Sequence, residues 1–265
     1  MSSTTIVFIT GANTGIGLEV VKALLQSQKA YTILLGGRSI DKANAAVKDV
    51  QAQFPDSSST VTSIQIDIED DNSISQAYDR ISKEYGRLDV LVNNAGAAFD
   101  GQVMEGKLSM REMWNKSWAL NTTSTHIMTH TFIPLLLKSS DPRLLFVTSG
   151  TSTMAESEDL SVPINHSPAK GWPKQGFSVA AYRSSKTGMN MMMRDWVRVL
   201  KEDGVKIWAI SPGYLATGLG GSQERNKKAG AGDPALGGTF IRDVVEGTRD
   251  ADVGKVVRRS GVQPW

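Results

Sequence analysis

The chain has 265 residues, of which 40% are hydrophobic and 21% are charged, and its formal net charge is +2. This length and composition predict one globular domain with a sizeable core, and the small charge argues against nucleic acid or a membrane as a partner. The absence of cysteine excludes disulfides, thiolate metal sites and a cysteine nucleophile. No apolar run is long enough to cross a bilayer and no signal-like segment leads the chain, so we expect a cytoplasmic protein.

A β-branched run, Thr5 to Ile9, predicts a buried strand of a parallel sheet. It leads into a glycine-rich turn, Thr10 to Gly17, after which Leu18, Val21 and Leu24 recur at helical spacing. In this context glycines let the backbone approach a pyrophosphate, and the first N–H groups of the helix point at it. The sequence therefore predicts a dinucleotide site, with an ordinary glycine-rich turn as the alternative. Its candidate residues are Gly11, Asn13, Thr14, Gly15, Ile16 and Gly17.

The second strand, Tyr31 to Leu35, ends in two glycines that are followed by Arg38 and Ser39. An acidic residue at this position would bind the ribose 2′-hydroxyl of NAD and repel a 2′-phosphate. Here a guanidinium and a hydroxyl stand instead, and both suit a phosphate. We therefore predict NADP(H) as the cofactor; the alternative is a solvated arginine.

Two further strands, Val61 to Ile66 and Leu88 to Val92, also end in polar residues. Asp67 can accept a hydrogen bond from an adenine amino group, or it can simply cap the next segment. The later strand leads into Asn93 to Gly96, where small residues let the backbone lie against a ribose and asparagine amides can tie strand ends together. Between the strands, a capping box at Ser73 to Gln76 predicts the start of a helix.

A second capping box, Ser109 to Glu112, predicts a long helix that is kinked or cut short at Pro134. Asn121 lies in its middle, where an amide is a poor helix former and needs another reason to be present. His126 and His130 have a metal-like spacing, but no glutamate lies between them and no third ligand is evident. We expect packed or solvated histidines and no metal site.

The fifth strand, Arg143 to Thr148, ends at Ser149, and residues 150–180 then show no strong period. A loop of this length in a compact domain is usually functional. The helix after it begins with Tyr182 and Lys186, which lie on one helical face because they are four residues apart. An ammonium beside a phenol lowers its pKa from about 10 towards working pH, as a general acid for a carbonyl requires. The alternative is a solvated helix face.

The sixth strand, Val205 to Ile210, precedes Pro212 and Gly213, and a last strand is expected at Val253 to Val257. Residues 214–233 are polar and rich in glycine, which predicts a mobile lid. The alternation of strands and helices predicts an α/β fold over residues 1–265. We expect one Rossmann-type domain, a doubly wound parallel sheet of about seven strands with helices on both faces.

These motifs, taken in order, resemble those of the short-chain dehydrogenases/reductases over nearly the whole chain. They are Thr10 to Gly17, Asn93 to Gly96, Ser149, Tyr182 with Lys186, and Pro212 with Gly213. Within the family the chain is most similar to the carbonyl reductases. The stretches that carry this closer likeness are Gly15 to Leu18, Lys83 to Gly86, Leu88 to Gly96, the extra residues before Tyr182 and the ending Val262 to Trp265.

The resemblance implies roles for four catalytic residues. Tyr182 donates or takes the proton at the substrate oxygen, and Lys186 lowers its pKa and binds the nicotinamide ribose. Ser149 orients and polarises the carbonyl, and Asn121 holds a water that links Lys186 to solvent. Such donors suit the chemistry, because hydride arriving at carbon builds negative charge on oxygen.

The resemblance also implies the rest of the site. The further cofactor residues are Asp67, Ile68, Asn94, Ala95, Gly96, Tyr182, Lys186, Pro212, Gly213, Leu215 and Thr217. The substrate residues are Ser149, Gly150, Thr151, Trp172, Tyr214 and Trp265, although either tryptophan can instead be a packing residue. The expected partner is a small molecule with a carbonyl or secondary-alcohol group.

Two departures from the family pattern leave questions open. Thr14 stands where many NADP-using members have a second basic residue, so Arg38 has less help with a 2′-phosphate. The segment before Tyr182 is shorter than in the vertebrate carbonyl reductases, so a homo-oligomer is as open as a monomer. The expected activity is NADPH-dependent reduction of a ketone or aldehyde. The alternatives are an NADP-linked secondary-alcohol dehydrogenase and a non-catalytic cofactor-binding regulator.

Overall fold

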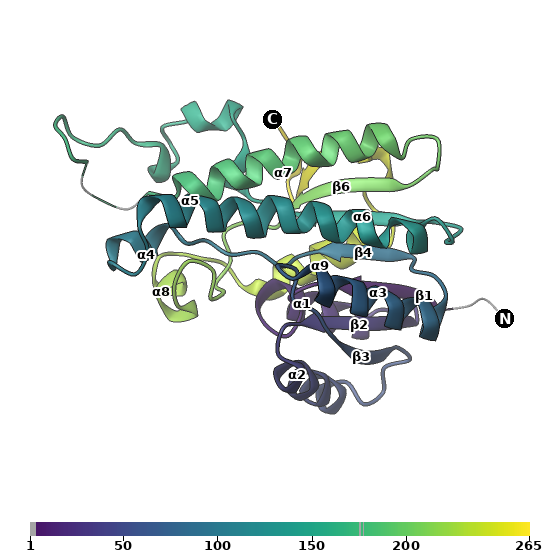
Figure 1. The fold of residues 1–265 in the computed structure, drawn as a ribbon. Coiled ribbons are helices and arrows are strands. Elements are labelled where there is room, and N and C mark those ends of the chain that lie inside the picture. Colours follow the sequence, from purple (N-terminus) through teal and green to yellow (C-terminus); the bar gives the residue numbers. More distant parts are fainter. Residues whose placement is uncertain (1–3, 175, 177) are drawn as a thin grey trace.

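The structure is a computed structural model that describes residues 4–174, 176 and 178–265. Its centre is an eight-stranded sheet with the order β3-β2-β1-β4-β5-β6-β7-β8 (Figure 1). Neighbours from β3 to β7 pair in parallel, and β8 pairs with β7 in antiparallel orientation. The strands are β1 (Thr5–Ile9), β2 (Tyr31–Gly37), β3 (Thr60–Gln65), β4 (Val90–Asn93), β5 (Arg143–Val147), β6 (Lys206–Ser211), β7 (Val256–Arg258) and β8 (Gly261–Gln263).

Helices cover both faces of this sheet (Figure 1). They are α1 (Gly15–Leu25), α2 (Ile40–Gln53), α3 (Asp71–Tyr85), α4 (Asp100–Met104), α5 (Met110–Trp118), α6 (Thr125–Leu136), α7 (Ala180–Val199), α8 (Gln223–Lys228) and α9 (Pro234–Val245). Successive side chains of a strand point to opposite faces. On β1, Phe8 joins the core under α3, α6 and α7, whereas Val7 and Ile9 join the core under α1, α2 and α9. None of the described helices is long and apolar enough to cross a membrane.

The expected doubly wound α/β fold is confirmed, with one strand more than the seven expected. The last parallel strand is Val256–Arg258 where Val253 to Val257 was expected, and β8 follows it through a tight turn. Gly261 closes this turn with a φ of +140°, a conformation that glycine adopts without steric cost. A strand of three residues is too short to produce a recognisable hydrophobic period, so it could not be read from the sequence.

One expected helix start is confirmed and one is wrong. At α5, the Ser109 N–H donates to the Glu112 carboxylate at 2.8 Å and the Glu112 N–H donates to the Ser109 hydroxyl at 3.3 Å, which is the expected capping box. At α3 the helix begins two residues before Ser73, because Asp70 caps it by accepting from Asn72 N at 2.9 Å. The Ser73 hydroxyl instead accepts a hydrogen bond from Asp67 N at 2.9 Å.

The long helix expected from Ser109 onward consists of three pieces. A π-helical turn, η1 (Ala119–Ser124), joins α5 to α6 and contains Asn121. Pro134 lies in the last turn of α6, which ends two residues later at Leu136. π-helical turns inside helices are frequent at functional sites. The position of Asn121 in η1 therefore agrees with a functional reason for an amide in the middle of a helix.

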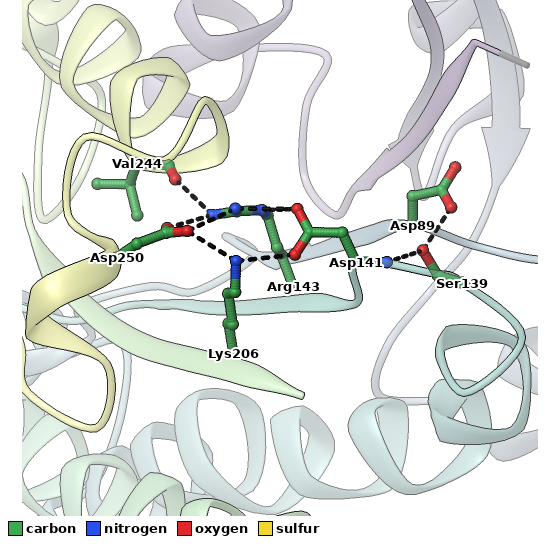
Figure 2. Close-up of polar contacts among 7 residues, drawn as sticks. All are labelled: Asp89, Ser139, Asp141, Arg143, Lys206, Val244 and Asp250. Carbon is green, nitrogen blue, oxygen red and sulfur yellow. Dashed lines mark hydrogen bonds and ion pairs between the residues drawn. The ribbon is translucent and has the colours of Figure 1, made fainter. Parts of the chain in front are cut away.

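An ion cluster lies at the edge of the sheet where the strands begin (Figure 2). The Arg143 guanidinium contacts the carboxylates of Asp250 at 2.7 Å and Asp141 at 2.9 Å. Lys206 contacts the same two carboxylates at 2.7 and 2.9 Å. Close by, the Ser139 hydroxyl donates to Asp89 at 2.6 Å. Both cations and both of their carboxylate partners are thus paired, which suits a structural role.

Candidate active site

The motifs singled out from the sequence meet at the opposite edge, where the parallel strands end. β1 lies between β2 and β4. The chain winds from β1 outward to β3 on one side and from β4 outward to β6 on the other, so a crevice opens between the ends of β1 and β4. The segments that follow β1, β4, β5 and β6 converge there. They are residues 10–17, 94–100, 148–152 and 212–217.

Glycines bring the turn after β1 against the segment after β4. Gly11 has a φ of +62°, and a Cβ there would lie 3.0 Å from the Cα of Ala95. A Cβ at Gly17 would lie 2.5 Å from Nδ2 of Asn94. That same amide donates to the carbonyl oxygens of Thr10 at 2.9 Å and Gly11 at 3.2 Å, so it ties the two strand ends together. Larger residues at these glycines would force the two segments apart.

The start of α1 is suited to an anion. Its N-cap residue, Thr14, has an extended backbone, and its side chain makes no capping hydrogen bond. Gly15 follows with a φ of +59°. The first N–H groups of a helix have no partner inside the helix and carry the positive end of its dipole. The glycine turn and the uncapped helix start therefore fit the pyrophosphate of a dinucleotide.

The end of β2 lies beside this turn, because a Cβ at Gly37 would lie 3.1 Å from Oδ1 of Asn13. Arg38 follows and is exposed, and no ion pair of its guanidinium is found in the described part of the chain. Ser39 caps α2 by accepting from Lys42 N at 3.4 Å. A cation, a hydroxyl and a helix start thus stand together where the sequence predicts a 2′-phosphate.

Asp67 and Ile68 follow β3. The Asp67 carboxylate accepts a hydrogen bond from Glu69 N at 3.0 Å within the turn before α3, and the cap of that helix is Asp70. Ile68 is buried in the core. Contact of either residue with an adenine ring stays a prediction.

Asn121 and Lys186 are buried beneath the segment that follows β4. Asn121 is fully buried: its Oδ1 accepts from Ala97 N at 3.0 Å and its Nδ2 donates to the Ser185 hydroxyl at 3.0 Å. The Lys186 ammonium donates to the Val147 carbonyl at 2.8 Å.

Gly96 lies directly on both of these side chains. A Cβ at this position would approach Asn121 Oδ1 to 2.8 Å and Lys186 Nζ to 3.2 Å. Any larger residue would push the segment after β4 away from them. Three positions that are far apart in sequence therefore meet at one point.

Tyr182 is 9% exposed, and the Ser149 side chain is near enough to its phenol to lower the pKa of the phenol. The Ser149 hydroxyl also lies 2.9 Å from the Thr151 hydroxyl and accepts from Thr151 N at 3.1 Å. The structure therefore brings Ser149, Tyr182, Lys186 and Asn121 to one edge of the sheet, as the resemblance implies.

Burial controls the protonation of the pair on α7. It raises the pKa of Tyr182 to about 12, a rise that the Ser149 hydrogen bond opposes and the Asp100 carboxylate reinforces. Burial also lowers the pKa of Lys186 to about 8. The expectation that a neighbouring ammonium lowers the tyrosine pKa below its ordinary value is therefore corrected: desolvation is the largest cause and raises this pKa, and the Lys186 ammonium is directed at Val147 O.

Two residues of the site were missed by the sequence analysis. Asp100 accepts hydrogen bonds from the N–H groups of Ala181 and Tyr182, 81 and 82 residues away. Gln263 on β8 is 1% exposed and donates from Nε2 to the Ser149 carbonyl at 3.2 Å. Neither residue belongs to a local pattern, because each acts only through the folded chain.

A cavity of about 280 Å³ is lined by Gly150, the residue after Ser149. Its lining combines the ends of β5 and β6 with the β7–β8 hairpin: Gly150, Glu156, Ser211, Pro212, Gly213, Arg258, Arg259, Ser260 and Gln263. The aromatic residues expected at a substrate are not among the residues that line this cavity. Trp172 is 85% exposed, Trp265 packs over Arg194, and Tyr214 lies 3.3 Å from the Asn226 side chain through its hydroxyl. Their contact with a substrate stays a prediction.

The expected lid, residues 214–233, contains α8 and is folded back on its own start. Asn226 Nδ2 donates to the carbonyls of Thr217 at 2.9 Å and Leu219 at 3.0 Å. Leu215 forms a bridge with Gly232. The other expected substrate segment, residues 150–180, forms short 3₁₀ turns, and its Gln175 and Phe177 lie outside the described residues.

His126 and His130 stack near an aromatic side chain. Both side chains are exposed, and their rings lie 5.2 and 6.5 Å from the Trp196 ring. In the described ranges, no group of three or more His, Asp or Glu side chains could hold a metal ion.

The fold and the site together define a dinucleotide-binding α/β protein of the oxidoreductase kind. A family model described as short chain dehydrogenase matches residues 5–159 and 164–228. The short-chain dehydrogenase/reductase eupG of Phoma sp. is 46% identical, with 98% of this chain and 97% of that protein covered. The chain belongs to the short-chain dehydrogenase/reductase family, as its motifs indicated.

Carbonyl reductases are among the similar proteins. Carbonyl reductase (NADPH) 1 of Sus scrofa is 29% identical over 88% of this chain and 86% of its own length. The crystal structure of NADPH-bound carbonyl reductase from chicken fatty liver superposes with a TM-score of 0.78 at 21% identity, and 99% of each chain is covered. This second likeness concerns the fold alone.

Proposed function

We propose that this protein is an NADPH-dependent reductase that transfers a hydride to the carbonyl of a ketone or aldehyde, with Tyr182 as the general acid. The observation that supports this most is the convergence of Tyr182, Ser149 and Lys186 beside Gly96, at the crevice where the glycine turn fits a dinucleotide. Secondary-alcohol oxidation by the same residues is the reverse reaction.

The proposed mechanism assigns a separate task to each side chain. When bound, NADPH supplies the hydride that forms the new C–H bond. The Ser149 hydroxyl and the Tyr182 phenol donate to the carbonyl oxygen as negative charge builds on it. The phenolic proton then passes to that oxygen and yields the alcohol, and Tyr182 recovers a proton from solvent past Lys186 and Asn121.

Tyr182 is in the protonated form that donation requires, while burial makes its phenol a weaker acid than an ordinary tyrosine. A phenol with a pKa of about 12 is fully protonated at neutral pH and is therefore ready to donate. Lys186, with a pKa near 8, remains mostly charged at neutral pH and favours the phenolate that forms when the proton leaves. Its ammonium would also hold the nicotinamide ribose.

The choice of NADP(H) is supported by Arg38 and Ser39, which stand without an acidic residue at the end of β2. We assign the 2′-phosphate to these two residues and the pyrophosphate to the turn of Gly11, Asn13, Thr14, Gly15, Ile16 and Gly17. The remaining contacts are assigned to Asp67 and Ile68 at the adenine, to Asn94, Ala95 and Gly96 at the ribose, and to Pro212, Gly213, Leu215 and Thr217 at the carboxamide.

The substrate is proposed to enter over Ser149, Gly150 and Thr151, between the 150–180 loop and the 214–233 lid. The chain would act as one catalytic domain in the cytoplasm on a small molecule, as a monomer or a homo-oligomer. The test is loss of NADPH absorbance against a panel of ketones, aldehydes and quinones. Turnover of at least one carbonyl is expected, and none at all would contradict the proposal.

The cofactor assignment has its own test, the Arg38→Asp variant. A carboxylate there repels a 2′-phosphate and can bind a ribose hydroxyl, so we expect the NADPH/NADH ratio of kcat/KM to fall about 100-fold. Arg111→Asp, a change at an exposed residue of α5, is the matched control. An unchanged ratio in Arg38→Asp would show that another residue selects the cofactor.

A further inference from the structure

The helix that carries Tyr182 has only a partial cap from the residues before it, since the Ser178 hydroxyl accepts from Ala180 N at 3.3 Å and leaves the next two N–H groups free. The N-cap residue of α7 is Val179, whose side chain makes no hydrogen bond to the helix. An apolar side chain cannot satisfy the free N–H groups of a first helical turn. Asp100, on α4, supplies the missing acceptors: Oδ1 accepts from Ala181 N at 2.9 Å and Oδ2 accepts from Tyr182 N at 3.2 Å.

Asp100 is itself firmly held. It is 7% exposed and begins α4, four residues after Gly96. Between them, Ala97 exchanges two hydrogen bonds with the Asn121 amide, at 2.9 and 3.0 Å. This short segment is therefore tied to Asn121 at one end and to the start of α7 at the other, so it joins three parts of the proposed site.

We propose that Asp100 is a positioning residue for the reaction: its carboxylate fixes the place of the Tyr182 phenol by holding the first backbone N–H groups of α7, and its negative charge disfavours the phenolate. The inference rests on the proposed function. It assigns a task to a buried carboxylate that contacts the backbone of Tyr182 and not its phenol, and it explains how α7 can have a valine as its N-cap residue.

The electrostatics of the helix start support both parts of this task. A helix N-terminus carries a partial positive charge, which favours the phenolate of a tyrosine located there. The Asp100 carboxylate opposes this effect, and its charge adds to the burial that raises the pKa of Tyr182. Burial raises the pKa of Asp100 too, while its bonds from Ala181 and Tyr182 lower it.

Few other charges face the Tyr182 phenol. On α7, Lys186 lies one turn further on, and Arg183 is directed at the Thr151 carbonyl at 3.1 Å. Neither η1 nor η2 (Gly150–Ser152) contains a charged residue, and the charged side chains of α5 are exposed: Arg111, Glu112 and Lys116. Asp100 is thus the nearby carboxylate whose removal should change the protonation of the Tyr182 phenol.

Two variants separate the two tasks. Asp100→Asn keeps one acceptor oxygen but removes the charge, so the phenolate becomes easier to form and carbonyl reduction should be lost at a lower pH than in the wild type. Asp100→Ala removes both acceptors, and we expect kcat to fall roughly 10- to 100-fold because the phenol is displaced. Asp70→Ala, which removes the aspartate cap of α3 near the proposed adenine contacts and not near Tyr182, is the matched control and should change neither the pH profile nor kcat.

The readouts include one that does not need turnover. Amide hydrogen exchange at Ala181 and Tyr182 should be faster in Asp100→Ala than in the wild type. If the wild type reduces no carbonyl, the proposed function fails, and unchanged exchange would separately overturn the capping role. If the wild type is active but Asp100→Asn keeps its pH profile, the electrostatic role is refuted. Should Asp100→Ala not fold, Asp100→Asn alone decides the inference.

Discussion

The two edges of the sheet treat buried charge in opposite ways. At the edge where the strands begin, Arg143 and Lys206 share the carboxylates of Asp141 and Asp250 (Figure 2). At the edge where the strands end, Lys186 is 4% exposed, and the described partners of its ammonium are a carbonyl oxygen and a methionine sulfur. One edge satisfies its charges, and the other leaves a charge poorly compensated.

The pKa values of Asp250 and Lys186 differ in the way that this contrast between the two edges predicts. Hydrogen bonds from Arg143 hold the pKa of Asp250 at about 2, so this pairing stabilises the fold above the ordinary pKa and is lost as the pH falls towards 2. Burial without a carboxylate moves the pKa of Lys186 down to about 8. A group held away from its ordinary pKa by desolvation destabilises the fold, and such groups gather at functional sites.

The largest effect on activity is expected at the edge where the parallel strands end. Tyr182→Phe removes the proton donor but keeps the ring, so we expect turnover to fall at least about 1,000-fold while NADPH still binds. Stability should change little, because the buried ring is kept and only the hydroxyl is removed. Carbonyl reduction and NADPH fluorescence titration measure the two effects. Tyr78→Phe, which alters a tyrosine of α3, serves as control, and a fully active Tyr182→Phe enzyme would refute the mechanism.

The opposite edge should respond in stability and not in chemistry. Arg143→Ala leaves Asp141 and Asp250 with Lys206 alone and removes a guanidinium that lies 5.5 Å from the Trp208 ring. We expect a loss of about 3 kcal/mol in the free energy of unfolding, since the arginine is buried and both carboxylates are partly exposed. Activity per folded molecule should stay at the wild-type level.

Arg198→Ala is the matched control for this loss, because its ion pair with Asp195 is largely exposed. Such a pair contributes less than about 1 kcal/mol. Denaturant unfolding of the three proteins compares the values. Equal losses in the two variants would mean that burial of the cluster adds nothing to stability.

The features that depend on a local sequence pattern could be predicted from the sequence. The apolar strand runs, the glycine turn and the Ser109–Glu112 capping box each have a cause within a few residues. The Asp100 contacts with α7, the Gln263 contact with Ser149 and the π-helical turn at Asn121 have no such cause. The raised pKa of Tyr182 also escaped, because desolvation depends on what the whole fold places over the phenol.

Lys186→Met tests the cost of the poorly compensated charge. Below pH 8 the buried ammonium destabilises the fold, and this cost is relieved as the pH rises from about 8 to the ordinary pKa of 10.5. Removal of the ammonium should raise the free energy of unfolding by about 3 kcal/mol at pH 7. About 1–2 kcal/mol of this is lost because the Val147 carbonyl loses its hydrogen-bond donor. We therefore expect a net gain of about 1–2 kcal/mol together with loss of turnover.

Lys206→Met is the matched variant for Lys186→Met, because it makes the same substitution at the edge where the strands begin and where the lysine is paired with carboxylates. Hydrogen bonds from Lys206 to Asp250 and Asp141 raise the pKa of the lysine, so its charge stabilises the fold at neutral pH. Unfolding at pH 7 should then show Lys206→Met less stable and Lys186→Met more stable than the wild type, and the advantage of Lys186→Met should shrink towards pH 10. If both variants lose stability alike, Lys186 is compensated after all and the contrast between the edges fails.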